Sequence, residues 1–569
     1  MSIKYSDKPW LNFYEDGVPS TVEVPDETLL HLLEKTCDKY PEQTAILFKG
    51  REIKYCDLQF LVDTLAAALA ANGFKKGDRA ALFMVNIPQF IIAFFAILKA
   101  GGIVVSTNPL YSERELEHQL IDCGAETVFV MSLYYKTLKN VQQRGLTKVK
   151  RVIVTNIKEY LPTHLRVLFT VVKERKDGHH VDLHPGDMWF QDLLASGERA
   201  PLVDTKISPD DVAILQYTGG TTGVAKGAVA LHRNLVANTY QCQAWITDVL
   251  EGGETVLLAI PLFHTFGLVA GLCFGMSIGA RLILIPDPRD QEDVLDNIKK
   301  YKPSVFPGVP AMYVAINNNP RVQENDCDIK SIRICISGSA PLMLETKIRF
   351  EELTGAKLVE GYGLTEANVV THGNPIHGTY KEGSIGLPFP NVECRIMDQV
   401  TGEQEMPVDE CGELVIRSPS IMQGYWQLPT ETSNALRDGW LYTGDIARMD
   451  EDGYFFIEDR KKDMIIASGF NIYPREVEEV LLTHPSVLEV AVAGVPDPKR
   501  GETVKAWIVK RANDDIDERA IIDWSKERLA KYKYPRQIEF LDELPRTSVG
   551  KVLKRELVKE ALEATQNDG

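Results

Sequence analysis

Short runs rich in valine and isoleucine alternate with helical patterns up to about residue 450, and this alternation constrains the fold more than any other feature of the chain. Strands that are apolar on both faces must be covered on both sides, and parallel strands joined through helices meet that requirement. We therefore expect an α/β fold with parallel or mixed sheets covered by helices. The predicted strands are RAALFMV (79–85), VAILQYT (212–218), TVLLAI (255–260), RLILI (281–285), IRICISG (332–338) and AKLVEGYG (356–363).

The pattern changes near residue 460. VLEVAVAGV (487–495) and ETVKAWIVKR (502–511) predict strands, and DERAIIDWSKERLAKY (517–532) predicts a charged amphipathic helix. A chain of 569 residues also exceeds the size at which a single core keeps growing. We predict a large N-terminal domain over residues 1–461 and a small α+β domain over residues 462–569, joined at an exposed hinge in the charged EDRKKD (458–463).

A glycine- and threonine-rich segment, YTGGTTGVAKGA (217–228), directly follows one of the predicted strands. Glycines let backbone N–H groups converge on an anion, threonine hydroxyls add donors, and lysine adds a full charge. The segment therefore predicts a polyphosphate site, although a surface turn is the alternative. The candidate ligands are Thr218, Gly219, Gly220, Thr221, Thr222, Gly223 and Lys226.

This segment differs from a Walker A loop, which has glycine before its lysine and serine or threonine after it. Those two places hold Ala225 and Gly227 here. No side chain next to the lysine can bind Mg²⁺, and no helix clearly opens on the phosphates. The residues therefore argue against a P-loop NTPase.

Two apolar stretches raise the question of membrane contact. Residues 255–280 contain no Asp, Glu, Lys or Arg and are long enough to span a bilayer, but Pro261, His264 and several glycines divide them. We expect a buried strand, loop and helix there. LPTHLRVLFTVVKERK (161–176) mixes apolar and basic residues, and it could rest on a membrane surface or pack against the protein's own core.

The charge balance excludes one broad class of function. With 63 Lys and Arg against 80 Asp and Glu, the formal charge is −17, which argues against a general nucleic-acid binder. The nine cysteines form no CxxC pair, which argues against a disulfide framework or a zinc ribbon. Charged residues also stand where a signal peptide needs an apolar core. We expect a protein of the reducing cytoplasm.

Five further motifs follow the phosphate segment, and the set is ordered along the chain: SGSAPL (337–342), EGYGLTEA (360–367), GWLYTGDIA (439–447), IEDRKKDMI (457–465) and PRTSVGKVLKREL (545–557). From about residue 25 to 560 the chain resembles the adenylate-forming superfamily of acyl-CoA synthetases, luciferases and peptide-synthetase adenylation domains. YTGGTTGVAKGA, DRKKDMIIASGFNIYPREVEEVL and GKVLKREL are most similar to bacterial long-chain fatty acid–CoA ligases. The resemblance implies Mg²⁺- and ATP-dependent ligation of a medium- or long-chain fatty acid to coenzyme A, through an acyl-adenylate, with release of AMP and pyrophosphate.

The resemblance also implies roles for single residues of the large domain. Lys226 would neutralise the departing pyrophosphate, Thr365 would donate to the α-phosphate, and Glu366 would bind Mg²⁺. A glutamate at a helix N-terminus, stabilised by the helix dipole, is the alternative for Glu366 and is compatible with metal binding. The residues that resemble the adenine-binding slot are Gly338, Ser339, Ala340, Glu360, Gly361, Tyr362 and Gly363.

Further roles come from the later motifs. Asp445 follows a strand, where an acid can take both ribose hydroxyls, and Arg460 would help to hold the same sugar. Lys551 matches the family lysine that bridges the attacking carboxylate and the α-phosphate. In the family the small domain is mobile and rotates about the position of Lys462, after which the loop around Gly469 lines the pantetheine channel.

PLFHTFGL (261–268) resembles the segment that borders the acyl pocket in the family, with His264 near the carboxylate and Gly267 and Leu268 beside it. His264 could equally be an ordinary core residue. Some relatives that take long chains have a tryptophan gate at the position of Leu268, so this chain lacks that gate. The histidines at 179, 180 and 184 lack ligand spacing, and we expect them in a surface loop.

Several alternatives share these motifs: a synthetase for aryl or short-chain acids, an acyl-AMP ligase that loads a carrier protein, a luciferase-type oxygenase, and a non-catalytic lipid-binding protein. The last is disfavoured by the presence of Lys226, Glu366, Asp445 and Lys551. We expect a monomer or homodimer that binds fatty acid, ATP and coenzyme A but no nucleic acid. Weak peripheral contact with the inner face of the membrane is expected because the substrate is a lipid.

Overall fold

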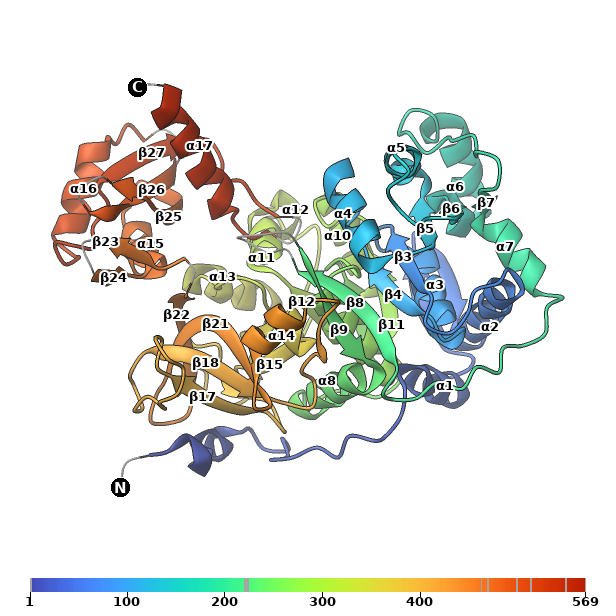
Figure 1. Ribbon diagram of the computed structural model, residues 1–569, viewed down its shortest axis with the longest axis horizontal. Helices are drawn as coiled ribbons and strands as arrows, with labels where there is room; N and C mark the ends of the chain where they lie inside the picture. Colours follow the sequence, from blue (N-terminus) through green and yellow to red (C-terminus); the bar gives the residue numbers. More distant parts are fainter. Residues whose placement is uncertain are drawn as a thin grey trace.

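The structure is a computed structural model, and it describes residues 3–218, 225–461, 463–467, 470–497, 500–511, 514–547 and 550–567. The strands form four sheets, and the two largest share one apolar core. Figure 1 shows the chain after about residue 465 as a separate lobe, orange to red, beside the larger body.

The nine-stranded sheet has the order β16-β15-β14-β13-β12-β10-β11-β1-β2. Its central strands are parallel, and β2, β15 and β16 pair antiparallel towards the edges. The strands are β1 (Thr44–Phe48), β2 (Arg51–Lys54), β10 (Thr255–Leu258), β11 (Arg281–Leu284), β12 (Val305–Gly308), β13 (Ile334–Ser337), β14 (Lys357–Leu364), β15 (Val369–Gly373) and β16 (Leu387–Pro388).

The eight-stranded sheet has the order β19-β9-β8-β4-β3-β5-β6-β7, and only β9 and β19 pair antiparallel. The almost wholly buried helix α3 (Pro88–Lys99) and α8 (His232–Trp245) contribute to the core that the two sheets share. The strands are β3 (Arg79–Phe83), β4 (Ile103–Ser106), β5 (Thr127–Met131), β6 (Arg151–Thr155), β7 (Met188–Trp189), β8 (Val212–Thr218), β9 (Lys226–Leu231) and β19 (Gly424–Tyr425).

Two smaller antiparallel or mixed sheets follow along the chain. The first contains β17 (Glu393–Met397), β18 (Gly412–Arg417), β20 (Leu436–Arg437), β21 (Trp440–Met449) and β22 (Phe455–Arg460). The second contains β23 (Ile465–Ala467), β24 (Phe470–Ile472), β25 (Val487–Asp497), β26 (Gly501–Lys510) and β27 (Gln537–Leu541), with helices α15 (Pro474–Leu482), α16 (Glu518–Lys526) and α17 (Lys554–Asn567). The last sheet and its helices have apolar clusters of their own.

Each strand predicted from an apolar run is present, and the expected mixed α/β architecture is confirmed. Residues 255–280 form buried β10, a turn, and the buried helical segments η6 (Phe266–Cys273) and α9 (Phe274–Ser277). Among the described residues no helix has the length and apolar character needed to cross a bilayer. The helix predicted over 517–532 is shorter, because the chain turns after Lys526 and buries Leu529 in the core of the last sheet.

Three surface expectations need correction. The charged segment at 458–463 is not wholly exposed, because β22 runs to Arg460 and the buried Asp459 carboxylate accepts a hydrogen bond from Arg475 N at the start of α15 (2.9 Å). His179 is buried against Ser132 and is no surface-loop residue. In the helical segment formed by α6 (Thr163–Leu168) and η5 (Phe169–Lys173), the partly buried Leu165 and Phe169 pack against the protein's core, but four other apolar residues are exposed, so the expected packing on the core holds only in part.

His232 offers a test of how α1 (Leu29–Lys39) is held on α8. Its Nδ1 accepts a hydrogen bond from Leu29 N (3.3 Å), and burial lowers its pKa from 6.5 to about 4. As the pH falls from 6.5 towards 4, the unfolded chain takes up a proton that the folded chain does not, so the free energy of unfolding falls. We expect His232→Asn, whose Oδ1 can accept the same bond, to reduce this fall by up to about 1.4 kcal/mol per pH unit.

The measurement is urea unfolding of both proteins between about pH 7 and pH 5. His164→Gln, which changes an exposed histidine, is the matched control and should leave the pH dependence of stability unchanged. Parallel pH profiles for the parent and His232→Asn would contradict the burial of a neutral imidazole.

Candidate active site

The predicted phosphate segment is the tip of a β-hairpin. β8 ends at Thr218, β9 begins at Lys226, and the two strands pair antiparallel with Thr218 opposite Lys226. Gly219, Gly220, Thr221, Thr222 and Gly223 lie outside the described residues. A Walker A loop leads from a strand into a helix, whereas this segment leads into a strand, so the expectation against a P-loop NTPase is confirmed.

Lys226 and Glu366 meet at one side chain, that of Tyr425 in β19. The Lys226 ammonium forms an ion pair with Glu431 of α14 (Pro429–Ala435) and lies 5.2 Å from the centroid of the Tyr425 ring. The Tyr425 hydroxyl donates to Glu366 Oε1 (2.8 Å), and Met422 N donates to the backbone oxygen of the same glutamate (2.8 Å). The cation thus lies over the Tyr425 ring, and the carboxylate is held by the hydroxyl of the same residue.

Glu366 and its neighbour Thr365 lie in η7 (Thr365–Ala367), directly after β14. Within the described ranges no group of three or more His, Cys, Asp or Glu side chains could hold a metal ion. Mg²⁺ usually takes one or two carboxylates and completes its shell with phosphate oxygens and waters. The single Glu366 carboxylate, near the hairpin that the sequence predicts to bind phosphate, fits this coordination pattern.

Tyr362, Asp445 and Arg460 come together from three strands. The Tyr362 hydroxyl donates to Asp445 Oδ2 (2.5 Å), and Asp445 Oδ1 lies 3.6 Å from Arg460 Nε across the β21–β22 ladder. Burial first, and the charge of Asp445 second, raise the pKa of Tyr362 well above its usual value. The phenol therefore keeps its proton and remains a donor.

His372 lies behind Tyr362. The two residues pair across β14 and β15, with their rings edge to face and the centroids 5.7 Å apart. His372 is fully buried beside Cys394, whose Sγ is 3.3 Å from its Nε2, and burial lowers the pKa of His372 to about 3. A neutral imidazole thus fixes the orientation of the tyrosine ring.

The loop after β13 carries the small residues of the predicted adenine slot. A Cβ at Gly338 would lie only 2.9 Å from the Phe266 ring, and Ser339 has a positive φ of 71°. Glu360 connects this loop to β14, because its carboxylate accepts from Leu342 N (3.0 Å) and from the Tyr380 hydroxyl (3.3 Å). Burial raises the pKa of Glu360.

The two glycines of EGYG differ in what they allow. A Cβ at Gly363 would lie 1.3 Å from the backbone oxygen of Val369 in β15, so only glycine permits this close approach of the two strands. Gly361 has more room, since its nearest neighbour would be a methyl group of Ile336 at 3.2 Å. Ala340 completes the loop that starts at Gly338.

The segment predicted to border the acyl pocket lies next to this loop. Phe266 N donates to His264 Nδ1 (3.3 Å), and the pKa of His264 is lowered to about 4, mainly by burial and further by the charge of Lys551. A Cβ at Gly267 would lie 2.3 Å from the backbone oxygen of Pro261, and Leu268 is completely buried. The imidazole is therefore neutral and lies within the field of the Lys551 ammonium.

Lys551 reaches this place from the C-terminal lobe on a tight loop. Thr547 N donates to Lys551 O (2.7 Å), Lys551 N donates to Thr547 Oγ1 (3.1 Å), and Gly550 between them has a φ of 77°. A Cβ at Gly550 would lie 3.8 Å from that of Ala311 in α11 (Pro310–Asn318). The same approach is visible in Figure 1, where the chain before α17 extends towards α11 and α12 (Pro320–Gln323).

The lobe is also held on the larger body near the end of β22. Arg475 Nη1 donates to Ile457 O (2.5 Å), and Gln399 Nε2 donates to the Tyr473 hydroxyl (3.0 Å). Lys462 and Gly469, the predicted hinge and channel residues, lie outside the described residues.

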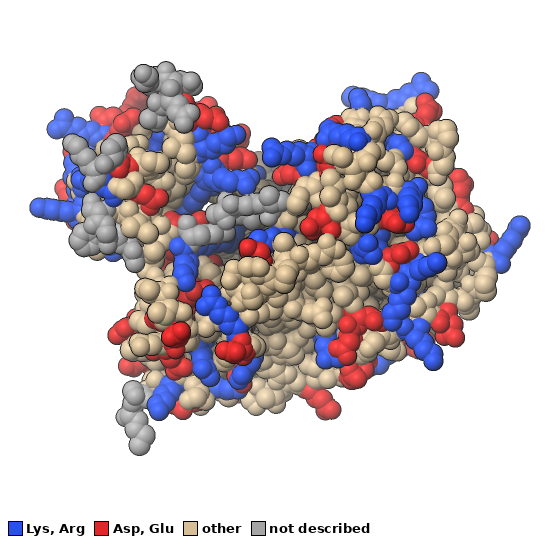
Figure 2. Space-filling model, in the orientation of Figure 1, with Lys and Arg blue, Asp and Glu red and all other residues tan. Residues whose placement is uncertain are grey.

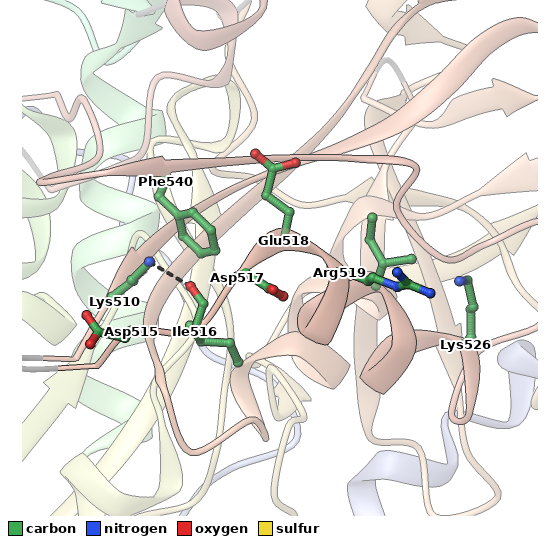
Figure 3. Close-up of a pocket in the computed structure, with 9 residues that line it drawn as sticks. Lys510, Asp515, Ile516, Asp517, Glu518, Arg519, Lys526 and Phe540 are labelled. Atoms are coloured by element: carbon green, nitrogen blue, oxygen red, sulfur yellow. Dashed lines mark hydrogen bonds between the residues drawn. The ribbon is translucent and has the colours of Figure 1, made fainter.

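A surface hollow on the C-terminal lobe lies apart from these residues. Figure 3 shows Lys510, Asp517, Glu518, Arg519 and Phe540 around it, with Lys510 Nζ donating to Ile516 O (2.7 Å). None of the described candidate site residues lines it, and its mixed charges define no single class of ligand.

Sequence reasoning missed Tyr425, Glu431 and His372. Tyr425 is 59 positions from Glu366, and no spacing rule connects the two. Glu431 follows a proline in LPTE, a pattern that predicts a helix start but no partner for Lys226. His372 could have been suspected only as an isolated polar residue within an apolar strand.

Comparisons with known proteins agree with this geometry. The AMP-binding enzyme family model matches residues 33–426, and the AMP-binding enzyme C-terminal domain model matches residues 476–551. A long-chain-fatty-acid–CoA ligase of Bacillus subtilis is 44% identical over 98% of this chain and 99% of its own length. A long-chain-fatty-acid–CoA ligase of Escherichia coli O6:H1 is 40% identical over 97% of this chain and 98% of its own length.

Among solved structures, ATP-bound MatB from Rhodopseudomonas palustris matches with a TM-score of 0.80 at 29% identity, over 94% of this chain and 99% of that one. Apo MatB, with the same identity and coverage, matches with a TM-score of 0.71. The chain is thus more similar to the ATP-bound form of that protein. Because one family model spans well over half of the chain, and near-full-length relatives share 40% or more of its residues, the chain belongs to the AMP-binding enzyme family of adenylate-forming acyl-CoA synthetases.

Proposed function

We propose that this chain is an ATP-dependent ligase that joins a medium- or long-chain fatty acid to coenzyme A through an acyl-adenylate, releasing AMP and pyrophosphate. The observation that carries the proposal is 44% identity, over nearly the full length of both chains, to a relative named for this reaction. Both half-reactions move negative charge, so they require cations, N–H donors and positioning more than a protein nucleophile. The charged and polar groups around the hairpin suit that requirement.

In the first half-reaction the fatty acid carboxylate attacks the α-phosphorus of ATP. Lys226 and residues 218–223 hold the leaving pyrophosphate, and Thr365 donates to the α-phosphate. Lys551 bridges the attacking carboxylate and the α-phosphate and offsets the charge that gathers on both. His264 remains neutral, as its lowered pKa of about 4 implies, and so does not draw the carboxylate away from Lys551.

The nucleoside is held by the other half of the site. Adenine lies between residues 338–340 and 360–363, against the face of Tyr362, while Asp445 and Arg460 take the ribose hydroxyls. His372 acts as a positioning residue, since it touches Tyr362 and no predicted ligand.

Glu366 is the proposed Mg²⁺ ligand. When bound, the ion supplies charge neutralisation across the phosphate oxygens. Tyr425 fixes the carboxylate through its hydroxyl, in the manner of the outer-shell partners that orient metal ligands.

The second half-reaction requires that Lys551 leave the site. We place the domain boundary between 461 and 462 and the hinge at Lys462, because β22 ends at Arg460 in one sheet and β23 begins at Ile465 in another. Rotation about this connection would withdraw Lys551 and bring the loop around Gly469 to the pantetheine channel. His264, Gly267 and Leu268 border the acyl chain throughout.

We also propose an oligomeric state and a location for the protein in the cell. The chain acts as a monomer or homodimer in the cytoplasm and contacts the inner face of the membrane weakly, because its substrate partitions into lipid. Nucleic acid is not a partner, in keeping with the charge of −17.

The direct test is a product assay with ATP, Mg²⁺, coenzyme A and acids from about C2 to C20. We expect AMP and pyrophosphate in equal amounts with acyl-CoA, and the highest kcat/KM for medium or long chains. Release of ADP and phosphate would overturn the adenylate mechanism. A preference for aryl or very short acids, or transfer only to a carrier protein, would replace the proposed substrate.

The two half-reactions can be separated by substitution. Lys551→Ala should reduce adenylation by about 10²- to 10³-fold, the order for loss of one preorganised charge donor, but should still convert a supplied acyl-adenylate to acyl-CoA. Lys462→Pro should do the reverse and accumulate acyl-AMP, because proline fixes φ at the hinge. Pyrophosphate release and thioester formation are measured separately. Lys559→Ala, which changes an exposed side chain of α17, is the control. Equal losses in both half-reactions for both variants would disprove domain alternation.

Tyr425→Phe tests the support of Glu366. Loss of the hydroxyl frees one carboxylate oxygen, and we expect the Mg²⁺ concentration for half-maximal rate to rise by about tenfold, as for other outer-shell partners of metal ligands. Tyr240→Phe in α8 is the matched control, since it removes a similar hydrogen bond from a tyrosine hydroxyl to Glu27 (3.1 Å). An unchanged Mg²⁺ dependence in Tyr425→Phe would argue against Glu366 as the metal ligand.

A further inference from the structure

An amphipathic helical segment near the end of the eight-stranded sheet presents its apolar side to solvent. Val167, Leu168, Val171 and Val172 are 59%, 57%, 79% and 55% exposed, and their spacing places them on one face of the continuous α6–η5 segment. Aliphatic side chains rarely gather on a surface without a function for the patch. We call these four residues the aliphatic face.

The opposite side of the segment anchors it, which explains why the aliphatic face points outwards. The Glu174 carboxylate is buried and accepts from Asn156 Nδ2 (3.2 Å) and from Lys158 Nζ (2.5 Å). Phe169 packs edge to face on the buried His179 ring, with the centroids 5.4 Å apart. The segment is therefore fixed on the protein by these polar and aromatic contacts and by the partly buried Leu165, while the aliphatic face stays in solvent.

Basic residues surround the aliphatic face. Arg166, Lys173, Arg175 and Lys176 are all exposed, and within the described part of the chain none of the four forms an ion pair. Of the two acids nearby, Glu174 is neutralised by Lys158, and the exposed Asp177 offsets one of the four cations, so the patch keeps a net positive charge. Figure 2 shows lysine and arginine side chains over the same corner of the molecule, around α5 (Tyr135–Gln143) and α6, far from the C-terminal lobe.

We propose that this segment is the surface on which the protein docks to an anionic lipid bilayer, with the aliphatic face inserted among the acyl chains and the four cations at the headgroups. The charge complementarity is local, because charges beyond about 10 Å are screened and the −17 of the whole chain is spread elsewhere. A second copy that met this face with its own copy of the face would bring a second basic patch to the contact and be repelled. The proposal rests on the proposed function, which gives the protein a lipid substrate to collect.

The experiment is flotation of the purified full chain with vesicles of phosphatidylcholine alone or with about one third phosphatidylglycerol. Each Lys or Arg near an anionic surface contributes about fivefold to binding. We expect Lys173→Glu with Arg175→Glu to weaken binding to the anionic vesicles by at least about twentyfold. Val171→Asp with Val172→Asp should weaken it by at least about tenfold.

Two control variants match these changes elsewhere on the surface. Lys330→Glu with Lys357→Glu reverses two exposed cations, and Val400→Asp charges a valine that is 93% exposed. Both should bind vesicles as the parent does. The proposal is overturned if the segment variants bind like the parent, or if the control variants lose as much.

Sedimentation and a ligase assay with octanoate, which needs no vesicle, complete the test. If the parent self-associates, and Val171→Asp with Val172→Asp dissociates it without changing vesicle binding, the face belongs to a second copy and the bilayer proposal is wrong. Unchanged octanoate activity in the segment variants shows that they are folded, so a loss of vesicle binding then supports the docking surface. If the parent protein itself shows no ligase activity, the proposed function is wrong. Vesicle binding by the parent and the variants then still tests the docking surface independently.

Discussion

The approach of the 547–551 loop to α11 is the contact on which the arrangement of the site depends. It carries a cation from the C-terminal lobe to the vicinity of His264, while the hydrogen bonds of Arg475 and Gln399 hold the lobe near the end of β22. Two of these contacts are hydrogen bonds, and the approach of Gly550 to Ala311 is a contact between small groups. Such an interface can be exchanged for another at modest cost, whereas a large apolar interface could not.

The large body, in contrast, holds its candidate site residues rigidly. The buried His372 fixes the ring of Tyr362, and the pairing of β21 with β22 fixes Asp445. The Tyr425 hydroxyl holds Glu366. Close backbone approaches, such as that of Gly363 to Val369, leave little freedom between β14 and β15. If these residues hold the nucleotide as proposed, a rigid site and a lobe attached by few contacts together suit two successive reactions at one place.

Much of this could be predicted from the sequence, and the reasons differ by feature. The strands around 212–218 and 332–338 were predictable because local apolar runs define buried parallel strands. The ordered motifs also named Lys226, Glu366, Asp445 and Lys551 as site residues, and their roles stay predictions. Tyr425, Glu431 and His372 were not predictable, since each meets its partner through tertiary packing of strands far apart in sequence. The sequence also did not predict which side of the α6–η5 segment faces solvent. That depends on the burial of Glu174 and His179, which is again a matter of tertiary packing.

If Lys226 binds polyphosphate as proposed, its ion pair with Glu431 affects which anions can bind there. An incoming ligand must exchange one carboxylate for its own charge, so the net gain grows with the number of negative charges that it brings. A triphosphate can win this exchange, whereas a single phosphate or a free fatty acid gains little. On the proposed roles, the glutamate thus acts as a charge threshold for the ligand of Lys226.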